Sequence, residues 1–398
     1  MRHFQMIESQ GEILMSNLEQ VIRNLFREGM DENEIKNALL KFSEYDVKEE
    51  FPFNLYPERT VFKKTDFEKK YMSNDIKGDK TKAYFVYKAL TIEGKDIKSD
   101  RSSSSFDPDN STGKCDFTKD IYSQLWGFKY QYGCFGKIDS FPEVDGKKIL
   151  FGGDCLNSLQ TSIFSASKMD KVTCLKKIAE NEESFLKEMN KSPIASMFSV
   201  SHAPGNFGLV PAYYNGFRGM NKEIKDYFPQ SLKYLMLNNF STTERLEAYT
   251  RNSKYKDGGA KDYFQDYSRD MFKKYINTMF LWDLIAYRNN HELVVDYSGK
   301  EVINTNSAYD EKDLAKWACG AKRFIRRRGI FMAAMLYASF MPDDFETIKK
   351  EIYTDDDIIV DDKYGYEAVF MLLEKKVKND KIKKVLGLAK EMIMKIRQ

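Results

Sequence analysis

The sequence predicts a mainly α-helical, multi-helix globular protein with one small β element. Its 398 residues include only nine prolines and 22 glycines, a composition that favours long regular elements over a loop-rich scaffold. Apolar side chains recur at helical spacing along most of the chain after residue 154. Short apolar runs of the strand type occur around residues 145–151 and 206–212, and we expect these runs to form the β element.

The N-terminal residues predict a pair of helices. Residues 12–28 place five apolar side chains at helical spacing: Leu14, Leu18, Val21, Ile22 and Leu25. Gly29 can end this helix, and Asp31 with Glu34 forms a capping box that opens a second helix through Leu40. The pair resembles the start of a helix-turn-helix, but residues 45–52 fit a DNA-reading third helix poorly. A packing or partner-binding arm is the simpler interpretation.

The rest of the chain divides into a core and a C-terminal helical region. Residues 50–113 are irregular, with a polar loop at 98–113, and a helix is expected over Phe117–Trp126. A strand over Lys148–Phe151 should stop at Gly152 and Gly153. The later helices are expected at 154–167, 170–190, 221–238, 242–251, 260–288, 310–341, 363–376 and 379–397. These elements suggest an N-terminal arm (1–48), a core domain (49–300) and a C-terminal helical region (301–398).

Composition and charge restrict the class of protein. The 63 basic and 60 acidic residues give a net charge of +3, which neither requires nor excludes a nucleic-acid partner. The five cysteines include no C-x-x-C pair, so a disulfide framework is not expected and a reducing cytoplasm is the natural setting. The first residues lack the apolar run of a signal peptide, and the longest apolar stretch, Ile330–Met341, is too short to span a bilayer. We therefore expect a cytoplasmic protein without a membrane partner.

The segment Ser199–Gly219 concentrates the residue types that carry chemistry. It holds one of the three histidines, His202, together with Asn206 and Asn215. In a ββα-metal nuclease, a histidine activates water, an asparagine orients that histidine, and a divalent metal such as Mg²⁺ or Mn²⁺ stabilises the leaving oxygen. His202, Asn206 and Asn215 are therefore the candidate catalytic residues. The structural alternative is a tight turn at Pro204–Asn206 followed by an inward-packing strand.

Two other segments are candidates for phosphate binding. In the first, Gly152–Ser158, glycines precede a predicted helix N-terminus, whose free N–H groups can bind an anion. Its candidate residues are Gly153, Asp154, Asn157 and Ser158, although simple helix capping is the alternative.

The second candidate is the basic run Lys322–Gly329 on a predicted helix. Arg323 and Arg327 fall on one helix face with Arg326 adjacent, which suits a phosphate clamp. Arg218, in the 199–219 segment, is a further candidate cation. The alternative is that the run is solvated or pairs internally with the acidic residues between 355 and 362.

Several segments in order resemble an uncharacterised bacterial family built on a domain of unknown function. The similarity covers about residues 98–295 and includes Phe106–Asp109, Gly153–Ser158, and Gly205–Pro211 followed by Asn215 and Arg218. It continues through Met220–Phe228 into the helix that ends near Leu284. This resemblance brings no activity with it.

The 199–219 segment is also distantly similar to the His-Me finger nuclease domains of type IV restriction enzymes. Five residues match their pattern: His202, Gly205, Asn206, Leu209 and Asn215. In those enzymes the catalytic histidine lies in an upstream segment, and this chain has no histidine between His3 and His202.

The sequence therefore leaves three classes of function open. The first is a nucleic-acid-directed protein with a phage-defence or toxin-type activity, for which a metal-dependent nuclease is the first enzyme class to test. The second is a non-enzymatic interaction module with a protein partner or a second copy of itself. The third is a nucleotide or phosphate sensor.

Overall fold

A computed structural model describes most of the helical part of the chain. The described residues are 18–45, 62–64, 90–92, 95–96, 117–127, 129–131, 137–139, 151–157, 182–201, 203–211, 228–238, 269–288, 291–302, 314–353 and 365–396. Within them the protein is mainly α-helical with small antiparallel sheets, as the sequence predicted. No described helix is both long enough and apolar enough to cross a bilayer.

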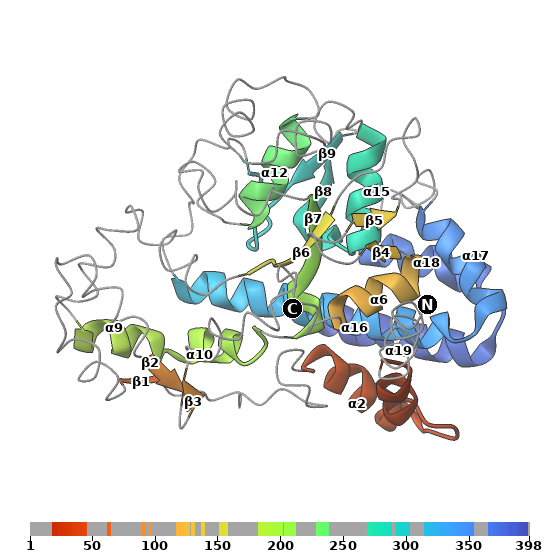
Figure 1. The fold of residues 1–398 in the computed structure, drawn as a ribbon, viewed down its shortest axis with the longest axis horizontal. Coiled ribbons are helices and arrows are strands. Elements are labelled where there is room, and N and C mark those ends of the chain that lie inside the picture. Colours follow the sequence, from red (N-terminus) through yellow and green to blue (C-terminus); the bar gives the residue numbers. More distant parts are fainter. Residues whose placement is uncertain are drawn as a thin grey trace, which may run out of the picture.

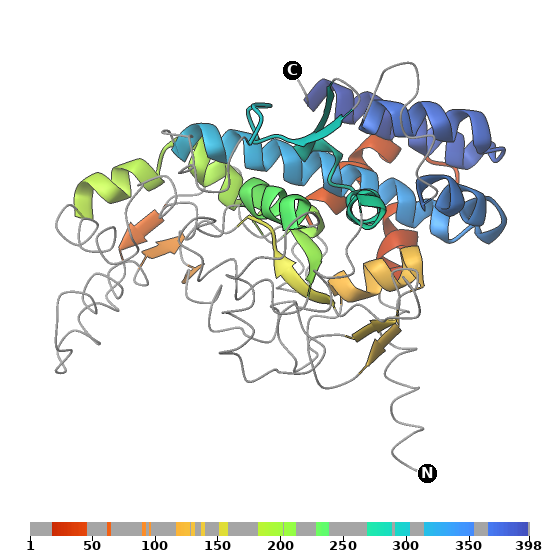
Figure 2. The same cartoon turned by 90° about the horizontal axis from the view of Figure 1, so that it is seen from above.

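The longest described helix, α16 (Leu314–Ser339), lies at the centre of the molecule (Figure 1). It packs against α2 (Glu32–Ser43), α10 (Ser192–Phe198), α19 (Asp380–Ile396), α6 (Phe117–Trp126) and α17 (Pro342–Tyr353). Figure 2 shows α19 on one side of α16 and the strands β6 and β7 on the other. Every residue from Ile330 to Leu336 is fully buried, because neighbours surround this half of the helix. The apolar run at 330–341 is thus a core segment.

The helix pair at the N-terminus is confirmed in detail. Residues 18–25 are helical, Gly29 takes a positive φ of 77°, and α2 begins after Asp31. Asp31 Oδ1 accepts a hydrogen bond from the Glu34 amide at 2.9 Å, and the Glu34 carboxylate accepts one from the Asp31 amide at 2.9 Å. Leu39 and Phe42 are fully buried in the same core as α16. The described part of the arm therefore packs into the main core, while the three-part domain division stays a prediction.

Aromatic rings join the last helices to the centre. Trp282 lies 5.2 Å from Phe331 and 5.1 Å from Tyr366, measured between ring centroids, with the planes nearly perpendicular. Phe331 also contacts Phe280 at 4.9 Å and Phe370, on α18 (Tyr366–Lys376), at 5.4 Å. Edge-to-face pairs of this kind stabilise beyond the area that they bury. The cluster fixes α18 and the short 3₁₀ helix η2 (Trp282–Leu284) against α16.

The expected small β element is the antiparallel pair β6 (Phe151–Cys155) and β7 (Phe207–Pro211), but one boundary differs from the prediction. Gly152 and Gly153 continue the strand instead of ending it, since they pair with Val210 and Leu209. Asp154 pairs with Gly208, so the helix expected to begin at residue 154 does not begin there. Partner strands supply the hydrogen bonds here, and a local sequence window contains no information about them.

The long helix expected over 260–288 is also shorter than predicted. The described helix α15 (Arg269–Met279) ends where Phe280 takes a φ of 54°, in the left-handed region. The chain then forms η2 and a hairpin of β8 (Ile285–Arg288) and β9 (His291–Val294), with Arg288 opposite His291. His291 therefore starts a strand. Burial of Phe280, Leu281 and Trp282 outweighs the helical periodicity that the sequence shows at this point.

The remaining described elements lie around this core. They are α9 (Glu182–Met189), α12 (Phe228–Asn238), the 3₁₀ helix η1 (Pro204–Asn206), a sheet of β1 (Phe62–Lys64), β2 (Leu90–Ile92) and β3 (Lys95–Asp96), and the pair β4 (Lys129–Gln131) and β5 (Lys137–Asp139). α6 has the bounds that the sequence predicted. Helix α17 was not predicted.

Candidate functional site

Asn206, a predicted catalytic residue, is fully buried and holds the chain around Asn157. Its Oδ1 accepts hydrogen bonds from the Asn157 amide at 3.0 Å and from Asn157 Nδ2 at 3.1 Å. Its Nδ2 donates to the carbonyl oxygens of Ser201 at 2.7 Å and Asn157 at 3.0 Å. The hydroxyl of Tyr297 donates to Asn157 Oδ1. These contacts give both amide side chains a structural role, and the catalytic role of Asn206 stays a prediction.

The remaining candidate residues of the 199–219 segment and of the Gly152–Ser158 segment are either strand residues or lie outside the described part of the chain. His202, Asn215, Arg218 and Ser158 fall outside the described residues. Gly153 and Asp154 are strand residues of β6, so they do not form the helix N-terminus that the anion-binding interpretation requires. Among the described residues, no group of three His, Cys, Asp or Glu side chains could hold a metal ion.

Arg328, in the predicted basic run, is fully buried and links four elements. Its Nε donates to the carbonyl oxygen of Met279 at 2.7 Å, and its Nη1 donates to those of Gly205 at 2.9 Å and Phe207 at 2.7 Å. Its Nη2 donates to the hydroxyl of Tyr122 on α6. Burial raises the pKa of Tyr122, and the nearby guanidinium opposes that rise. Arg328 therefore serves the fold, since its donors are directed at backbone carbonyls.

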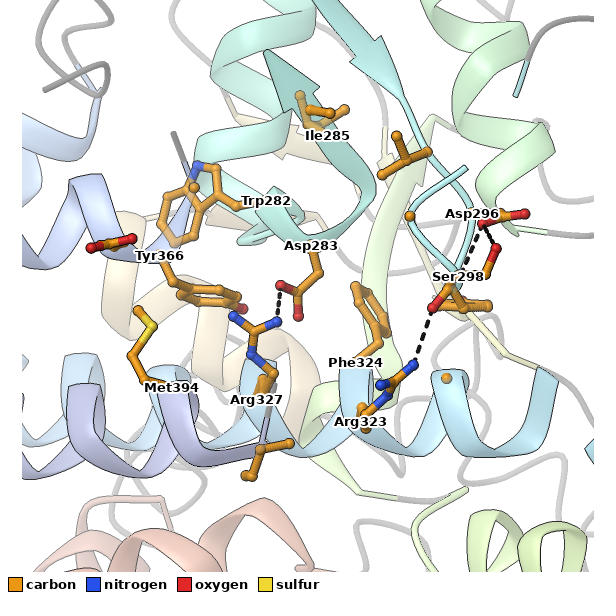
Figure 3. A pocket seen from close by; sticks show the side chains of 18 of the residues that line it. Trp282, Asp283, Ile285, Asp296, Ser298, Arg323, Phe324, Arg327, Tyr366 and Met394 are labelled. Atoms are coloured by element: carbon orange, nitrogen blue, oxygen red, sulfur yellow. Dashed lines mark hydrogen bonds and ion pairs between the residues drawn. The ribbon is translucent and has the colours of Figure 1, made fainter. Parts of the chain in front are cut away.

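Arg323 and Arg327 line one cavity of about 360 Å³, which we call the α16 cleft (Figure 3). Arg327 is 9% exposed, and its Nη1 lies 2.5 Å from Asp283 Oδ1. The ring of Tyr366 lies against the guanidinium, with 5.1 Å between the Arg327 Cζ atom and the ring centroid. Arg323 is exposed, and its Nη2 donates to the carbonyl oxygen of Tyr297 at 3.3 Å. The predicted arginine pair thus faces a common space.

One polar atom in the α16 cleft lacks a partner. The buried Nε of Arg327 makes no hydrogen bond. A buried N–H group that stays unpaired costs about 1–3 kcal/mol, so such atoms are uncommon and call for a ligand or a water. The single carboxylate of Asp283 uses only part of the donor fork of Arg327. The guanidinium therefore keeps hydrogen-bonding capacity for a further acceptor.

The cleft carries charges of both signs. Its cations are Arg288, Arg323 and Arg327, and its carboxylates are Asp283, Asp296 and Glu367.

Asp296 and Tyr366 define two edges of this cleft. Asp296 holds the turn after β9, since its Oδ1 accepts from the Ser298 amide at 2.8 Å and the Lys300 amide at 3.0 Å. Burial, followed by the charge of Asp283, raises the pKa of Tyr366 well above its usual value. Tyr366 is therefore a neutral phenol near neutral pH, and its hydroxyl donates to the carbonyl oxygen of Phe280 at 3.3 Å.

A second cavity of about 820 Å³ adjoins the cleft along the N-terminal half of α16, and we call it the basic groove. It shares Tyr297, Ser298, Arg323 and Ile396 with the cleft. The described residues that line it include four cations and no carboxylate: Lys316, Lys322, Arg323 and Arg326.

Two of these cations have partners within the fold. Arg326 forms an ion pair with Glu44 at the end of α2, and Lys322 donates to the hydroxyl of Ser196. Two arginines of the basic run form ion pairs inside the fold, Arg326 with Glu44 and Arg327 with Asp283. The pairing expected with residues 355–362 falls outside the described ranges and stays a prediction. Arg326 is directed to α2 and the groove, and Arg323 and Arg327 are the two arginines of the basic run that line the cleft.

Asp283, Tyr297 and Tyr366 belong to this site but were not singled out from the sequence. Each is an isolated residue with no local motif around it, and the three lie on different elements that only the fold brings to α16. The switch from α15 to η2 at Phe280, which places Asp283, had no clear sequence signal.

No protein-family model, curated protein or solved structure matches this chain. The resemblances to an uncharacterised bacterial family and to His-Me finger nucleases therefore stay predictions, and the function has to be argued from the site itself.

Proposed function

We propose that the protein binds a phosphate-bearing ligand in the α16 cleft, anchored by Arg323 and Arg327. The observation that carries this proposal is Arg327, which is nine-tenths buried, lines the cleft, and has an Nε without a hydrogen-bond acceptor. Arg323 lies one helical turn earlier on the same wall. Two guanidinium groups one turn apart can share the oxygens of one phosphate. This is the sensor class of function, relocated from the Gly152–Ser158 segment to α16.

The surroundings of the cleft support an anion with several oxygens. A volume of about 360 Å³ lies at the lower end of the range for small-molecule sites, roughly 300–1,000 Å³. The adjoining basic groove adds Lys316 and Lys322, whose charges raise the local concentration of anions. The negative charge of Asp283 weakens the binding of an anionic ligand near Arg327, because the two charges have the same sign. We therefore expect replacement of Asp283 by asparagine to strengthen anion binding.

Titration calorimetry with inorganic phosphate and pyrophosphate tests this proposal. Arg327→Gln and Arg323→Gln should each weaken binding by about tenfold or more, which corresponds to the loss of one charged hydrogen-bonding partner. The matched control is Arg23→Gln, which removes one exposed arginine whose ion pair among the described residues is with Glu19 on its own helix. Equal affinity of all three variants and the parent protein would refute the site, provided that circular dichroism shows them folded.

A second candidate function, nucleic-acid binding, is favoured by the basic groove alone. Of the described residues that line it, four are cations and none is a carboxylate, and the backbone of a nucleic-acid strand is a row of phosphates. Lys316→Gln should then weaken binding of a labelled single strand and lower its salt dependence, measured by fluorescence anisotropy. A metal-dependent nuclease and a role in phage defence remain proposals that depend on His202 and Asn215, outside the described residues.

A further inference from the structure

We propose that the ligand of this site is a nucleoside phosphate that places its ring and its innermost phosphate in the α16 cleft and its outer phosphates over the basic groove. The inference rests on the proposed function, since it assigns a chemical class to the phosphate-bearing ligand. It starts from the observation that the two cavities are adjacent and share lining residues. Arg323, Tyr297, Ser298 and Ile396 line both of them, so one ligand can occupy both.

The two cavities differ in chemistry in the way that the two ends of a nucleotide differ. The cleft offers the carboxylates of Asp283 and Glu367 as acceptors for ring N–H groups, beside the apolar side chains of Ile285 and Phe324 (Figure 3). Within the described part of the chain, the charged residues that line the basic groove are all cations. The innermost phosphate can lie between Arg323 and Arg327, and the outer phosphates are attracted along the groove, away from the carboxylates of the cleft, which fixes the direction of the ligand.

Arg323 lies where the two cavities meet, so it is placed to hold the phosphate nearest the sugar. Among the described residues its guanidinium donates one hydrogen bond, to the carbonyl oxygen of Tyr297, which leaves donors of its fork for a ligand. Lys316 lies seven residues earlier on α16, roughly 10 Å along the helix axis. It is exposed, and within the described part of the chain it forms no hydrogen bond or ion pair. A flexible lysine at that distance can reach the outer phosphates of a chain that starts at Arg323.

The other two cations of the groove act on the ligand through their electrostatic potential, not through new hydrogen bonds. Lys322 and Arg326 are already held by Ser196 and Glu44. Their charges still act on a bound polyphosphate because none of the described residues that line the groove is a carboxylate. We therefore assign Arg323, with Arg327, to the inner phosphate and Lys316 to the outer phosphates, and the position of the ring depends on the cleft alone.

Calorimetry with six probes on the full chain tests the assignment: inorganic phosphate, inorganic triphosphate, a nucleoside, a nucleoside monophosphate, a nucleoside triphosphate, and a short 5′-phosphorylated oligonucleotide. We expect the nucleoside triphosphate to bind at least about tenfold more tightly than the nucleoside or inorganic triphosphate alone. ATP and GTP arms show which ring the cleft prefers. If the oligonucleotide binds more tightly than the free nucleotide, the site still recognises a nucleoside phosphate, and its natural source is the 5′ end of a nucleic-acid strand.

Two variants separate the ends of the ligand. Lys316→Gln should weaken binding of the nucleoside triphosphate by about tenfold and leave the affinity for the nucleoside monophosphate unchanged. The matched control is Lys375→Gln, which replaces an exposed lysine on α18. Ala286→Phe fills the cleft from β8 and should reduce nucleoside triphosphate affinity to that of inorganic triphosphate. If inorganic triphosphate binds as tightly as the nucleoside triphosphate, this inference is wrong and the proposed function stands. If no probe binds to the folded protein, both are wrong.

Discussion

Replacing Gly205 by alanine should strongly destabilise the protein, because η1 touches α16 through this glycine. A Cβ atom there would lie 2.0 Å from the carbonyl oxygen of Ile325 and 2.8 Å from the amide nitrogen of Gly329. Ordinary contact begins near 3.4 Å, so the two backbones must separate by about 1.4 Å. That shift would also break the hydrogen bond from Arg328 Nη1 to the carbonyl oxygen of Gly205, now 2.9 Å long.

The magnitude follows from these two effects. Overpacking costs about 1–3 kcal/mol, and a lost hydrogen bond from a charged donor costs about 1.5–3 kcal/mol more. We therefore expect Gly205→Ala to lower the free energy of unfolding by about 4 kcal/mol. The matched control is Gly387→Ala in the exposed part of α19, where a Cβ meets nothing within 4 Å. This control should raise stability by about 0.5–1 kcal/mol, because alanine favours a helix.

Urea denaturation followed by circular dichroism at the helix band measures both variants against the parent protein. The same chemical change should have opposite signs at the two positions. Gly205→Ala within about 1 kcal/mol of the parent would show that the close approach of η1 and α16 is wrong.

Three further predictions concern buried contacts and one exposed ion pair. Arg328→Met should destabilise by about 3–5 kcal/mol in chemical denaturation, because it leaves buried carbonyl groups without a donor; a change below 1 kcal/mol would contradict the buried network. Asn206→Ala should cost about 3 kcal/mol in thermal or urea unfolding through its lost contacts with buried backbone groups, whereas a purely catalytic residue would leave stability unchanged. Hydrogen bonds from Lys36 and Lys395 lower the pKa of Glu391 from 4.5 to about 2, so its contribution to stability is present above pH 4.5 and is lost as the pH falls toward 2. Glu391→Gln should therefore be less stable than the parent near pH 7 and equally stable near pH 2, with salt reducing the difference; a difference independent of pH would exclude this ion pair as its cause.

The sequence alone was sufficient for the elements whose signals are local. The capping box at Asp31 and Glu34, the left-handed Gly29, helix α6 and the extent of α16 each depend on residues within a few positions of one another. Helical propensity, capping and apolar periodicity act over such distances, so the mainly α-helical fold was predictable. The placement of Arg323 and Arg327 on one face followed from helix geometry in the same way.

Only the tertiary structure decided which residues form the α16 cleft and the basic groove. Asp283 reaches Arg327 because Phe280 ends α15 and the chain turns into η2, and Tyr366 arrives from α18. Three adjacent arginines have three different environments: Arg326 pairs with Glu44, Arg327 lines the cleft, and Arg328 is buried against backbone carbonyls. Their order in the sequence is uniform, while their burial and partners depend on contacts between residues tens to hundreds of positions apart. Packing against distant elements, which no local window contains, sets the chemistry of each arginine.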